Sequence, residues 1–166
     1  DAQAGKRIFL GGLWGPNRDA NDVWVLYIDE NNQLTFEVNA DGSMQGQADN
    51  TIVRASASSL FGRWAHVAAI FDGASQSVRL YIDGRPAAGP VTNPAFPVSN
   101  LKPLSRPDLT TQFGSCNAIA DNENLYRTFR GMIDEIRVWE RALTDQEVLC
   151  QKDRSLNRSE ERRVGK

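Results

Sequence analysis

The sequence predicts an all-β protein, a sandwich or barrel of antiparallel strands. Turn signals such as ADGS, FDGASQ and IDGRP recur along the chain, about every ten to twenty residues. Short runs rich in Val, Ile, Phe, Tyr and Trp lie between these turns. Only one stretch, near the C-terminal end, carries a helix signal. Many short strands with almost no helix are typical of sandwiches and barrels.

Size and charge restrict the classes of function. The chain has 166 residues, of which 40% are hydrophobic, and its net charge is −2. This length fits one domain with a packed core. So small a net charge provides no basic field for nucleic acid or an anionic membrane. No apolar run reaches the roughly 18 residues of a membrane span, and the N-terminal DAQAGKRIF lacks the apolar stretch of a signal peptide.

Four runs predict strands, and two of them predict a hairpin. The runs are VWVLYID (23–29), QLTFEV (33–38), WAHVAAIF (64–71) and SVRLYID (77–83). The last two flank an Asp-Gly turn, so we expect a β-hairpin over Trp64–Asp83. Its second strand should direct Val78 and Leu80 to one face and Arg79 to the other, as in a sheet that buries one side.

The following stretch, Gly84–Pro107, is rich in proline and predicts an irregular loop, because proline cannot donate to an interior ladder. Strand signals resume at TTQFGS (110–115). Further on, Thr144 is followed three residues later by Glu147. This capping box predicts one short helix.

The stretch FRGMIDEIRVWERALTDQEV (129–148) places a carboxylate in an unusual position. Read as a strand, it puts Met132, Asp134, Ile136 and Val138 on one face, which is apolar except for Asp134. A buried charge is costly unless it is paired, hydrogen-bonded or bound to a metal. We therefore expect Asp134 to face inward and to be satisfied by a cation or by backbone donors.

Two stretches resemble laminin G-like domains of the concanavalin A-like lectin/glucanase superfamily. WAHVAAIFDGASQSVRLYIDGRPAA is similar to the family's central hairpin, and FRGMIDEIRVWERALTDQEV to its closing segment. The resemblance implies a two-sheet antiparallel jelly-roll sandwich with one short C-terminal helix over residues 1–157. It also implies a domain incomplete at both ends, because the family's opening strands are missing before Asp1 and its last strand after Asn157. Residues 158–166 form a charged tail, either a frayed terminus or a non-native addition.

The resemblance also implies candidate sites for Ca²⁺. Relatives with this sandwich hold a structural calcium ion through an acid at the head of the closing strand, which makes Asp134 a candidate ligand. The acidic loops 17–22 and 121–124 offer Asp22 and Asp121. Neither loop has the spacing of an EF-hand, and Asp and Asn also favour ordinary solvated turns.

Candidate ligand-binding residues lie in and beside the same loops. They are Trp14, Asn17, Asp19, Asn124 and Tyr126. Aromatic faces bind sugars and other ligands, although a core position is the alternative for Trp14. Trp24 and Trp64 fall inside strand patterns and are expected in the core.

The cysteines and the histidine allow few kinds of chemistry. Cys116 and Cys150 predict a disulfide and an oxidising compartment, with two free thiols as the alternative. They cannot form a zinc site with His66 at these scattered positions. A single histidine in a hairpin is a structural residue rather than part of a catalytic triad.

Catalysis is the less favoured class of function. Glycan-cleaving enzymes of this sandwich carry paired carboxylates on one strand face. Asp121 and Glu123 have a suitable spacing but lie in a loop, and Asp145 and Glu147 lie at a helix start. We therefore expect a non-catalytic, extracellular or cell-surface recognition module of a larger protein. Its partner would be a glycan or a protein ligand, for adhesion or targeting. A glycoside hydrolase or polysaccharide lyase of the same fold, or a structural spacer, is the alternative.

Overall fold

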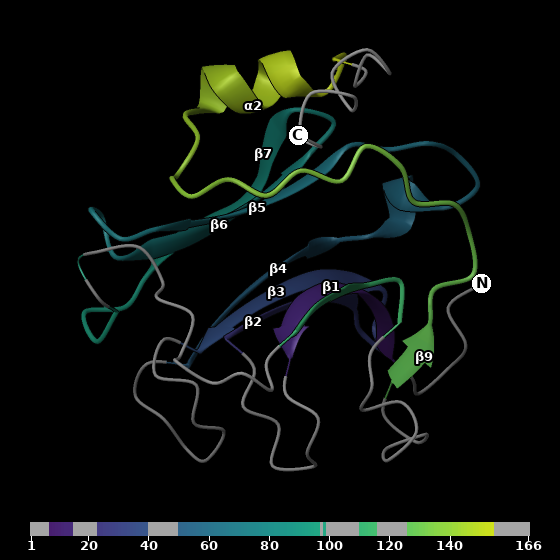
Figure 1. Ribbon diagram of the computed structural model, residues 1–166, viewed down its shortest axis with the longest axis horizontal. Helices are drawn as coiled ribbons and strands as arrows, with labels where there is room; N and C mark the ends of the chain where they lie inside the picture. Colours follow the sequence, from purple (N-terminus) through teal and green to yellow (C-terminus); the bar gives the residue numbers. More distant parts are fainter. Residues whose placement is uncertain are drawn as a thin grey trace, which may run out of the picture.

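A computed structural model describes residues 7–14, 23–39, 50–96, 98, 110–115 and 126–154. These residues form two stacked sheets with one short α-helix over the outer face of the smaller sheet (Figure 1). The prediction of an all-β sandwich with a single C-terminal helix is confirmed. The helix, α2 (Asp145–Gln151), begins at the capping box formed by Thr144 and Glu147, as predicted.

The larger sheet, here sheet A, has six strands. In spatial order they are β4 (Asn50–Ser56), β3 (Gln33–Asn39), β2 (Trp24–Ile28), β1 (Arg7–Trp14) and β8 (Thr110–Phe113), with β9 (Tyr126–Thr128) also paired to β1. All neighbours are antiparallel except β9, which runs parallel to β1. Gly12 lets β1 lie close to β2, because a Cβ atom there would come within 2.8 Å of the Trp24 carbonyl oxygen.

The smaller sheet, here sheet B, has three strands: β5 (Val67–Asp72), β6 (Ser77–Ile82) and β7 (Arg85–Thr92). The predicted hairpin over Trp64–Asp83 is confirmed as β5 and β6. A two-residue turn of Asp83 (φ 51°) and Gly84 (φ 75°) joins β6 to β7. Positive φ at both positions is the geometry that the Asp-Gly pair favours in tight hairpins.

The main core lies between the sheets, and a second apolar cluster lies under the helix. Leu34, Val38 and Val53 of sheet A pack with Val78 and Leu80 of sheet B. The second cluster is formed on the outer face of sheet B by Ile70, Tyr81, Leu143 and Val148. The alternation predicted for β6 therefore holds, since its odd-numbered side chains face the helix and its even-numbered ones the core.

The prediction of an irregular loop from Gly84 onward is wrong for its first part, because residues 85–92 form β7. This strand is one of the two edge strands of sheet B, beside the central β6. Prolines are tolerated there because an edge strand leaves half of its N–H groups without a ladder partner. The register against β6 is interrupted between Val78 and Tyr81, so the ladder is irregular where the prolines lie. A short 3₁₀ turn (Ser58–Leu60) links β4 to the segment before β5.

Residues 129–143, which connect β9 to α2, are not a strand in this structure, so the strand interpretation of Met132–Val138 is wrong here. None of these residues pairs with a described strand. Glu135 has a φ of 56°, which interrupts the extended backbone in the middle of the pattern. Asp134 is exposed rather than inward-facing, and its Oδ1 accepts a hydrogen bond from the N–H of Glu135 at 2.8 Å.

Candidate functional site

A cleft of about 1410 Å³ opens between the two sheets. One wall is formed by apolar side chains of sheet A, including Ile8, Leu10 and Leu26, and the other by Val67 and Phe71 of β5. Residues 128–141 run along its mouth. The cleft exceeds the roughly 300–1,000 Å³ of ordinary ligand pockets, so it can accept a large ligand or a segment of chain.

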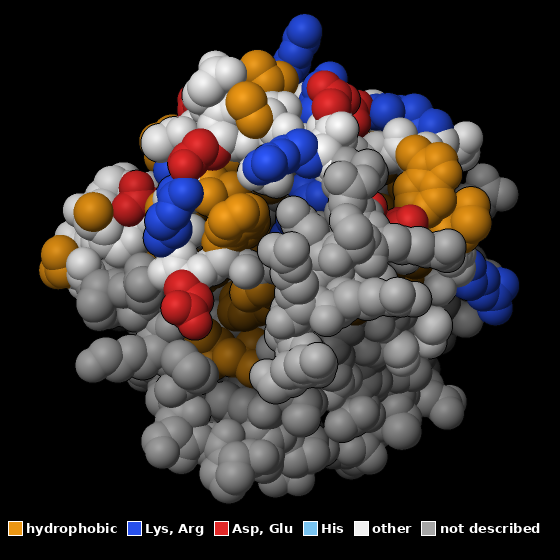
Figure 2. All heavy atoms as spheres, turned by 45° about the horizontal axis from the view of Figure 1, so that its top comes forward, with side chains coloured by type: hydrophobic (Ala, Val, Ile, Leu, Met, Phe, Trp, Pro, Cys, Tyr) orange, Lys and Arg blue, Asp and Glu red, His pale blue; other side chains and the backbone are white. Residues whose placement is uncertain are grey.

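Large hydrophobic side chains are exposed at the mouth of this cleft. Trp64 is 59% exposed, Met132 73% and Val138 71%, and Phe61 and Trp139 are also exposed. Figure 2 shows one face of the molecule, with hydrophobic side chains exposed among charged ones and others inside a hollow. The prediction that Trp64 is a core residue is therefore wrong, whereas Trp24 packs against the core as predicted. The sequence pattern did not reveal the exposure of Trp64, because Trp64 lies only three residues before β5 and so continues the strand pattern.

The charged residues around the cleft are more often basic than acidic. The basic ones are Arg63, Arg130, Arg137, Arg141, Lys152 and Arg154. The acidic ones are Asp83, Asp134, Glu135 and Glu140. Four of these bases are paired with carboxylates: Arg63 with Asp83, Arg137 with Glu135, Arg141 with Glu147 and Lys152 with Asp153. The charges around the cleft are therefore close to balanced.

One ion pair holds the mouth beside β5. The guanidinium of Arg63 donates to Oδ2 of Asp83, and the backbone N–H of His66 donates to Oδ1 at 3.1 Å. The hydrogen bond from Arg63 is the main cause that lowers the pKa of Asp83. The Nδ1 atom of His66 is buried and has no hydrogen-bond partner among the described residues. Its burial, and then the charge of Arg137, lower the pKa of His66.

Two arginines tie residues 129–143 to the ends of α2. At the C-terminal end, Arg137 donates to the carbonyl oxygens of Gln151 and Arg154 and pairs with Glu135. At the other end, Arg141 makes two contacts with Glu147, of 2.6 and 3.0 Å. A cation near the last carbonyl groups of a helix and a carboxylate in its first turn both interact favourably with the helix dipole, so both contacts stabilise α2.

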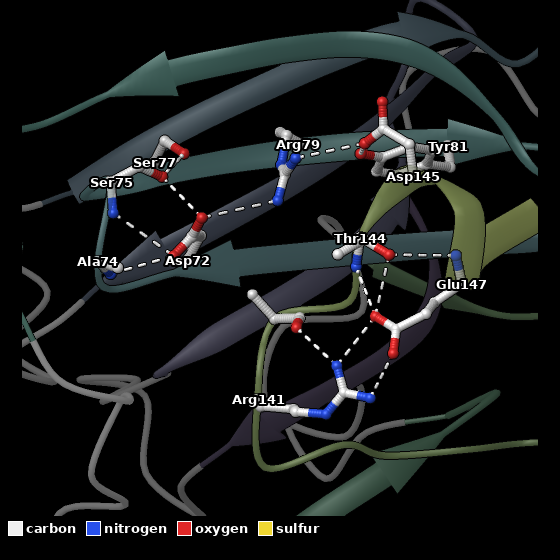
Figure 3. A network of polar contacts seen from close by, with 11 residues as sticks. Asp72, Ala74, Ser75, Ser77, Arg79, Tyr81, Arg141, Thr144, Asp145 and Glu147 are labelled. Atoms are coloured by element: carbon white, nitrogen blue, oxygen red, sulfur yellow. Dashed lines mark hydrogen bonds and ion pairs between the residues drawn. The ribbon is translucent and has the colours of Figure 1, made fainter.

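A polar network fixes α2 to sheet B (Figure 3). The hydroxyl of Tyr81 donates to Asp145 at 2.6 Å, and Arg79 lies between Asp145 and Asp72, at 3.4 and 3.7 Å. Asp72 in turn accepts hydrogen bonds from Ser75, which are the main cause that lowers its pKa. Each carboxylate already has a partner, so this network is structural support for the mouth of the cleft rather than a second site.

Several predicted site residues lie outside the part of the chain that the structure describes. These are Asn17, Asp19, Asp22, Asp121 and Asn124. Trp14 is the last residue of β1 and Tyr126 the first of β9, but their side chains are also outside the described part. Within the described ranges no three His, Cys, Asp or Glu side chains gather as metal ligands. Calcium binding at Asp134 stays a prediction, because calcium also takes backbone carbonyl oxygens and water.

The predicted disulfide is not formed in this structure. Cys150 is an exposed residue of α2 with a free thiol, and Cys116 lies outside the described residues. The side-chain amide of Gln146 lies 3.6 Å from its sulfur.

The buried carboxylate belongs to Asp29, which the sequence analysis did not single out. It is 5% exposed and follows β2 at the start of a tight turn. Its Oδ1 accepts the N–H groups of Asn31 and Gln33, both at 2.9 Å, and Oδ2 lies near Thr35 and Arg54. An Asp at a strand end, followed by Glu30 and two Asn residues, is the signal for such a turn.

The fold and the hairpin agree with a known family. A family model of the laminin G type, described as the concanavalin A-like lectin/glucanases superfamily, matches residues 1–149. The chain belongs to this superfamily. The resemblance seen in the sequence is thereby confirmed. None of the curated proteins compared with this laminin G-like chain matches it.

Solved structures similar to this laminin G-like chain include that of an S-layer protein. It is the crystal structure of residues 221–444 of an S-layer domain-containing protein from Clostridium thermocellum. The two are 20% identical with a TM-score of 0.38, and the match covers 78% of this chain. The chain spans 56% of that structure's length. No helix among the described residues is long and apolar enough to cross a membrane.

Proposed function

We propose that this chain is a non-catalytic recognition module of an extracellular or cell-surface protein. Its ligand, a glycan or a protein, lies at the cleft between the sheets. The observation that carries this proposal is the group of exposed hydrophobic side chains at the mouth, above all Trp64, Met132 and Val138. Such a group beside a cleft is typical of binding surfaces, whereas single exposed hydrophobic residues are common everywhere.

The charges near the cleft support recognition rather than catalysis. Asp83 is bound to Arg63, and Glu135 to Arg137. A general acid of a glycosidase needs a raised pKa, but the pKa of Asp83 is lowered. These carboxylates therefore suit the shaping of a binding surface. A protein ligand fits the aliphatic side chains of the mouth better than a glycan does, because Met and Val offer sugars neither stacking nor hydrogen bonds.

The test is binding of the purified chain to arrayed glycans and arrayed extracellular matrix proteins. We expect saturable binding to at least one of them. Trp64→Ala and Trp139→Ala should each weaken it about tenfold or more, as truncation of aromatic residues at interface centres does. Val98→Ala is the control, because Val98 is an exposed hydrophobic residue, more exposed than either tryptophan, that does not line the cleft. Sustained release of reducing sugar from a bound glycan would contradict the proposal.

We also propose Ca²⁺ as a cofactor of the acidic loops that carry Asp22 and Asp121. Calcium binding to the folded state alone would raise the melting temperature through mass action. Thermal melts with Ca²⁺ and with a chelator test this. Equal melting temperatures at millimolar Ca²⁺ would contradict it.

A further inference from the structure

One edge of sheet B lies open to the cleft. Sheet B has the order β5-β6-β7, so among the described strands β5 has a neighbour on one side only. Every residue from Ala65 to Phe71 lines the cleft. The edge of β5 is therefore part of the cleft wall.

The register shows which backbone groups of β5 face this open side. The N–H of Asp83 donates to the carbonyl oxygen of His66 at 2.8 Å, so His66 directs this oxygen toward β6. In an antiparallel pair, residues that bond to the partner strand alternate with residues whose N–H and C=O groups point away from it. Val67, Ala69 and Phe71 therefore direct their backbone groups away from β6. No backbone group among the described residues bonds to them on that side.

Residues 132–139 of the same chain, here called the strap, line the cleft beside this edge. Isoleucine, valine and tryptophan favour strands, and alternation would put Met132, Ile136 and Val138 on one face of such a strand. In this structure the large hydrophobic residues of the strap are between 41% and 73% exposed; they are Met132, Ile133, Ile136, Val138 and Trp139. This apolar surface is in contact with water although an apolar cleft lies next to it, which is unfavourable.

Contacts at both ends of the strap hold it at the cleft. Before the strap, the N–H of Phe129 donates to the carbonyl oxygen of Gly114 at 2.8 Å, just after β8 of sheet A. After the strap, Leu143 belongs to the apolar cluster that includes Ile70 of β5. Figure 1 shows this part of the chain leaving β9 at sheet A and reaching α2 at sheet B. The strap thus spans the mouth of the cleft from one sheet to the other.

Arg137 indicates which face of the strap would turn inward. It donates to the carbonyl oxygens of Gln151 and Arg154 at the end of α2, and α2 covers the outer face of sheet B. Side chains alternate along a strand, so with Arg137 on the outer side Ile136 and Val138 would enter the cleft.

Two features at Asp134 keep the strap open in this structure. Its Oδ1 accepts the N–H of Glu135 at 2.8 Å, and Glu135 has the φ of 56° that interrupts the extended backbone. Asp134 also lies on the face that would turn inward, where its carboxylate would lose contact with water. Closure therefore sets the burial of apolar side chains against the desolvation of one carboxylate.

We propose that the strap closes the cleft by pairing as a strand with the free edge of β5. In the closed form the unpaired backbone groups of β5 bond to the strap, and Ile136 and Val138 fill the space between the sheets. The open form described here is the one that admits a ligand. A ligand must then compete with the strap, which lowers its apparent affinity in proportion to the open fraction. This competition rests on the proposed recognition function, whereas closure concerns the chain alone.

Hydrogen exchange of the chain alone, followed by NMR at each residue, tests closure. An N–H that bonds to the strap exchanges only when the strap opens. We expect the N–H groups of Val67, Ala69 and Phe71 to exchange at least about tenfold more slowly than unprotected amides. Exchange at the unprotected rate would overturn the proposal. Protection that increases with protein concentration would assign the edge to a second copy and would also overturn it.

Two matched variants test whether the strap is the cover. Ile136→Asp places a charge on the inward face, so the protection of these three N–H groups should be lost. Ile133→Asp is the control, because Ile133 is similarly exposed, at 41% against 44%, but lies on the opposite face. We expect the control to change the three rates by less than about threefold. Equal loss in both variants, or no loss in either, would contradict the proposal.

The N–H groups of Ala68 and Ile70 are an internal control, because they bond to β6 rather than to the strap. They should stay protected in both variants. If Ile136→Asp exposes them as well, sheet B itself has opened, and Asp134→Val decides. This variant removes the charge and the acceptor that keep the strap open, so protection at the edge of β5 should rise at least about threefold. Unchanged or lower protection would refute closure.

These measurements contain no ligand, so they separate closure from recognition. If the edge of β5 exchanges freely while array binding still depends on Trp64, the strap proposal fails and the recognition function stands.

Discussion

The hydroxyl of Tyr81 donates a hydrogen bond of 2.6 Å to the carboxylate of Asp145 and so joins the central strand of sheet B to the first residue of α2. Burial of the Tyr81 side chain, followed by this hydrogen bond, raises the pKa of Tyr81 to about 12. Arg79, on the other side of Asp145, acts in the opposite direction. The neutral hydroxyl is therefore favoured by folding.

Tyr81 should make stability depend on alkaline pH. The stabilisation is complete below the ordinary tyrosine pKa near 10 and is lost as the pH rises toward 12. We expect wild-type protein to lose up to about 2 kcal/mol over this range from this residue, and Tyr81→Phe to lack this part of the loss. Absorbance of tyrosinate during an alkaline titration checks it directly. A wild-type curve in which every tyrosine ionises near pH 10 would contradict the expectation.

Glu147 should make stability depend on acid pH. The hydrogen bond from Arg141, and then the backbone N–H of Thr144, lower the pKa of Glu147 to about 2. The ionised form is favoured by folding, so its contribution is complete above the ordinary value of 4.5 and is lost as the pH falls toward 2. Glu147→Gln should lower the melting temperature at neutral pH and converge with wild type near pH 2. Asp153→Asn, which removes a more exposed acid, is the control and should follow the wild-type curve.

Removing the buried carboxylate of Asp29 should destabilise the fold strongly. Asp29→Ala leaves the N–H groups of Asn31 and Gln33 without their acceptor, which is a buried carboxylate in an otherwise exposed turn. We expect the free energy of unfolding to fall by about 2–4 kcal/mol in urea denaturation, because an unsatisfied buried group costs about 1–3 kcal/mol. Glu30→Gln, at the exposed neighbouring position, should change it by less than about 0.5 kcal/mol. A loss for Asp29→Ala as small as this control would show that solvent replaces the carboxylate.

Protonation of His66 should destabilise the protein below neutral pH. Burial and the charge of Arg137 lower the pKa of His66, while Asp83 and Asp153 raise it. The neutral ring is favoured by folding, so its contribution is complete above pH 6.5 and is lost as the pH falls through the lowered pKa. His66→Gln should remove this part of the pH dependence in melting curves between pH 8 and 5. The chain has one histidine, so its proton resonances in an NMR titration give the pKa without ambiguity. A value at or above 6.5 would disagree.

The sequence predicted those parts of the fold that local chemistry determines. Asp83 and Gly84 indicate their turn because few other pairs adopt positive φ twice in succession. Thr144 and Glu147 indicate the helix start because each satisfies the other's backbone N–H. The alternation around Asp134 failed because a strand pattern does not show whether a neighbouring strand is present. The same limit explains why residues 85–92 were interpreted as a loop, since only the sheet order shows that they form an edge.

The candidate site was predicted less well than the fold. A tryptophan in a strand pattern gives no indication of whether the opposite sheet covers it, and Trp64 is exposed because the cleft is open there. The buried carboxylate was expected at Asp134 and is found at Asp29, where neighbouring turn residues satisfy it. Both errors concern contacts between segments distant in the sequence, which periodicity alone does not specify.

The contacts that Arg137 and Arg141 make at the two ends of α2 all lie within one short segment of the chain, residues 135–154. Arg137 and Arg141 reach partners only 6 to 17 residues further along the chain. By contrast, Tyr81 and Arg79 lie more than 60 residues from their partner Asp145. A local opening event can therefore separate residues 135–154 from sheet B while the contacts of Arg137 and Arg141 within this segment stay intact. The helix would then move together with the residues that line the mouth of the cleft. Widening of the cleft entrance and detachment of α2 from sheet B would therefore be a single motion.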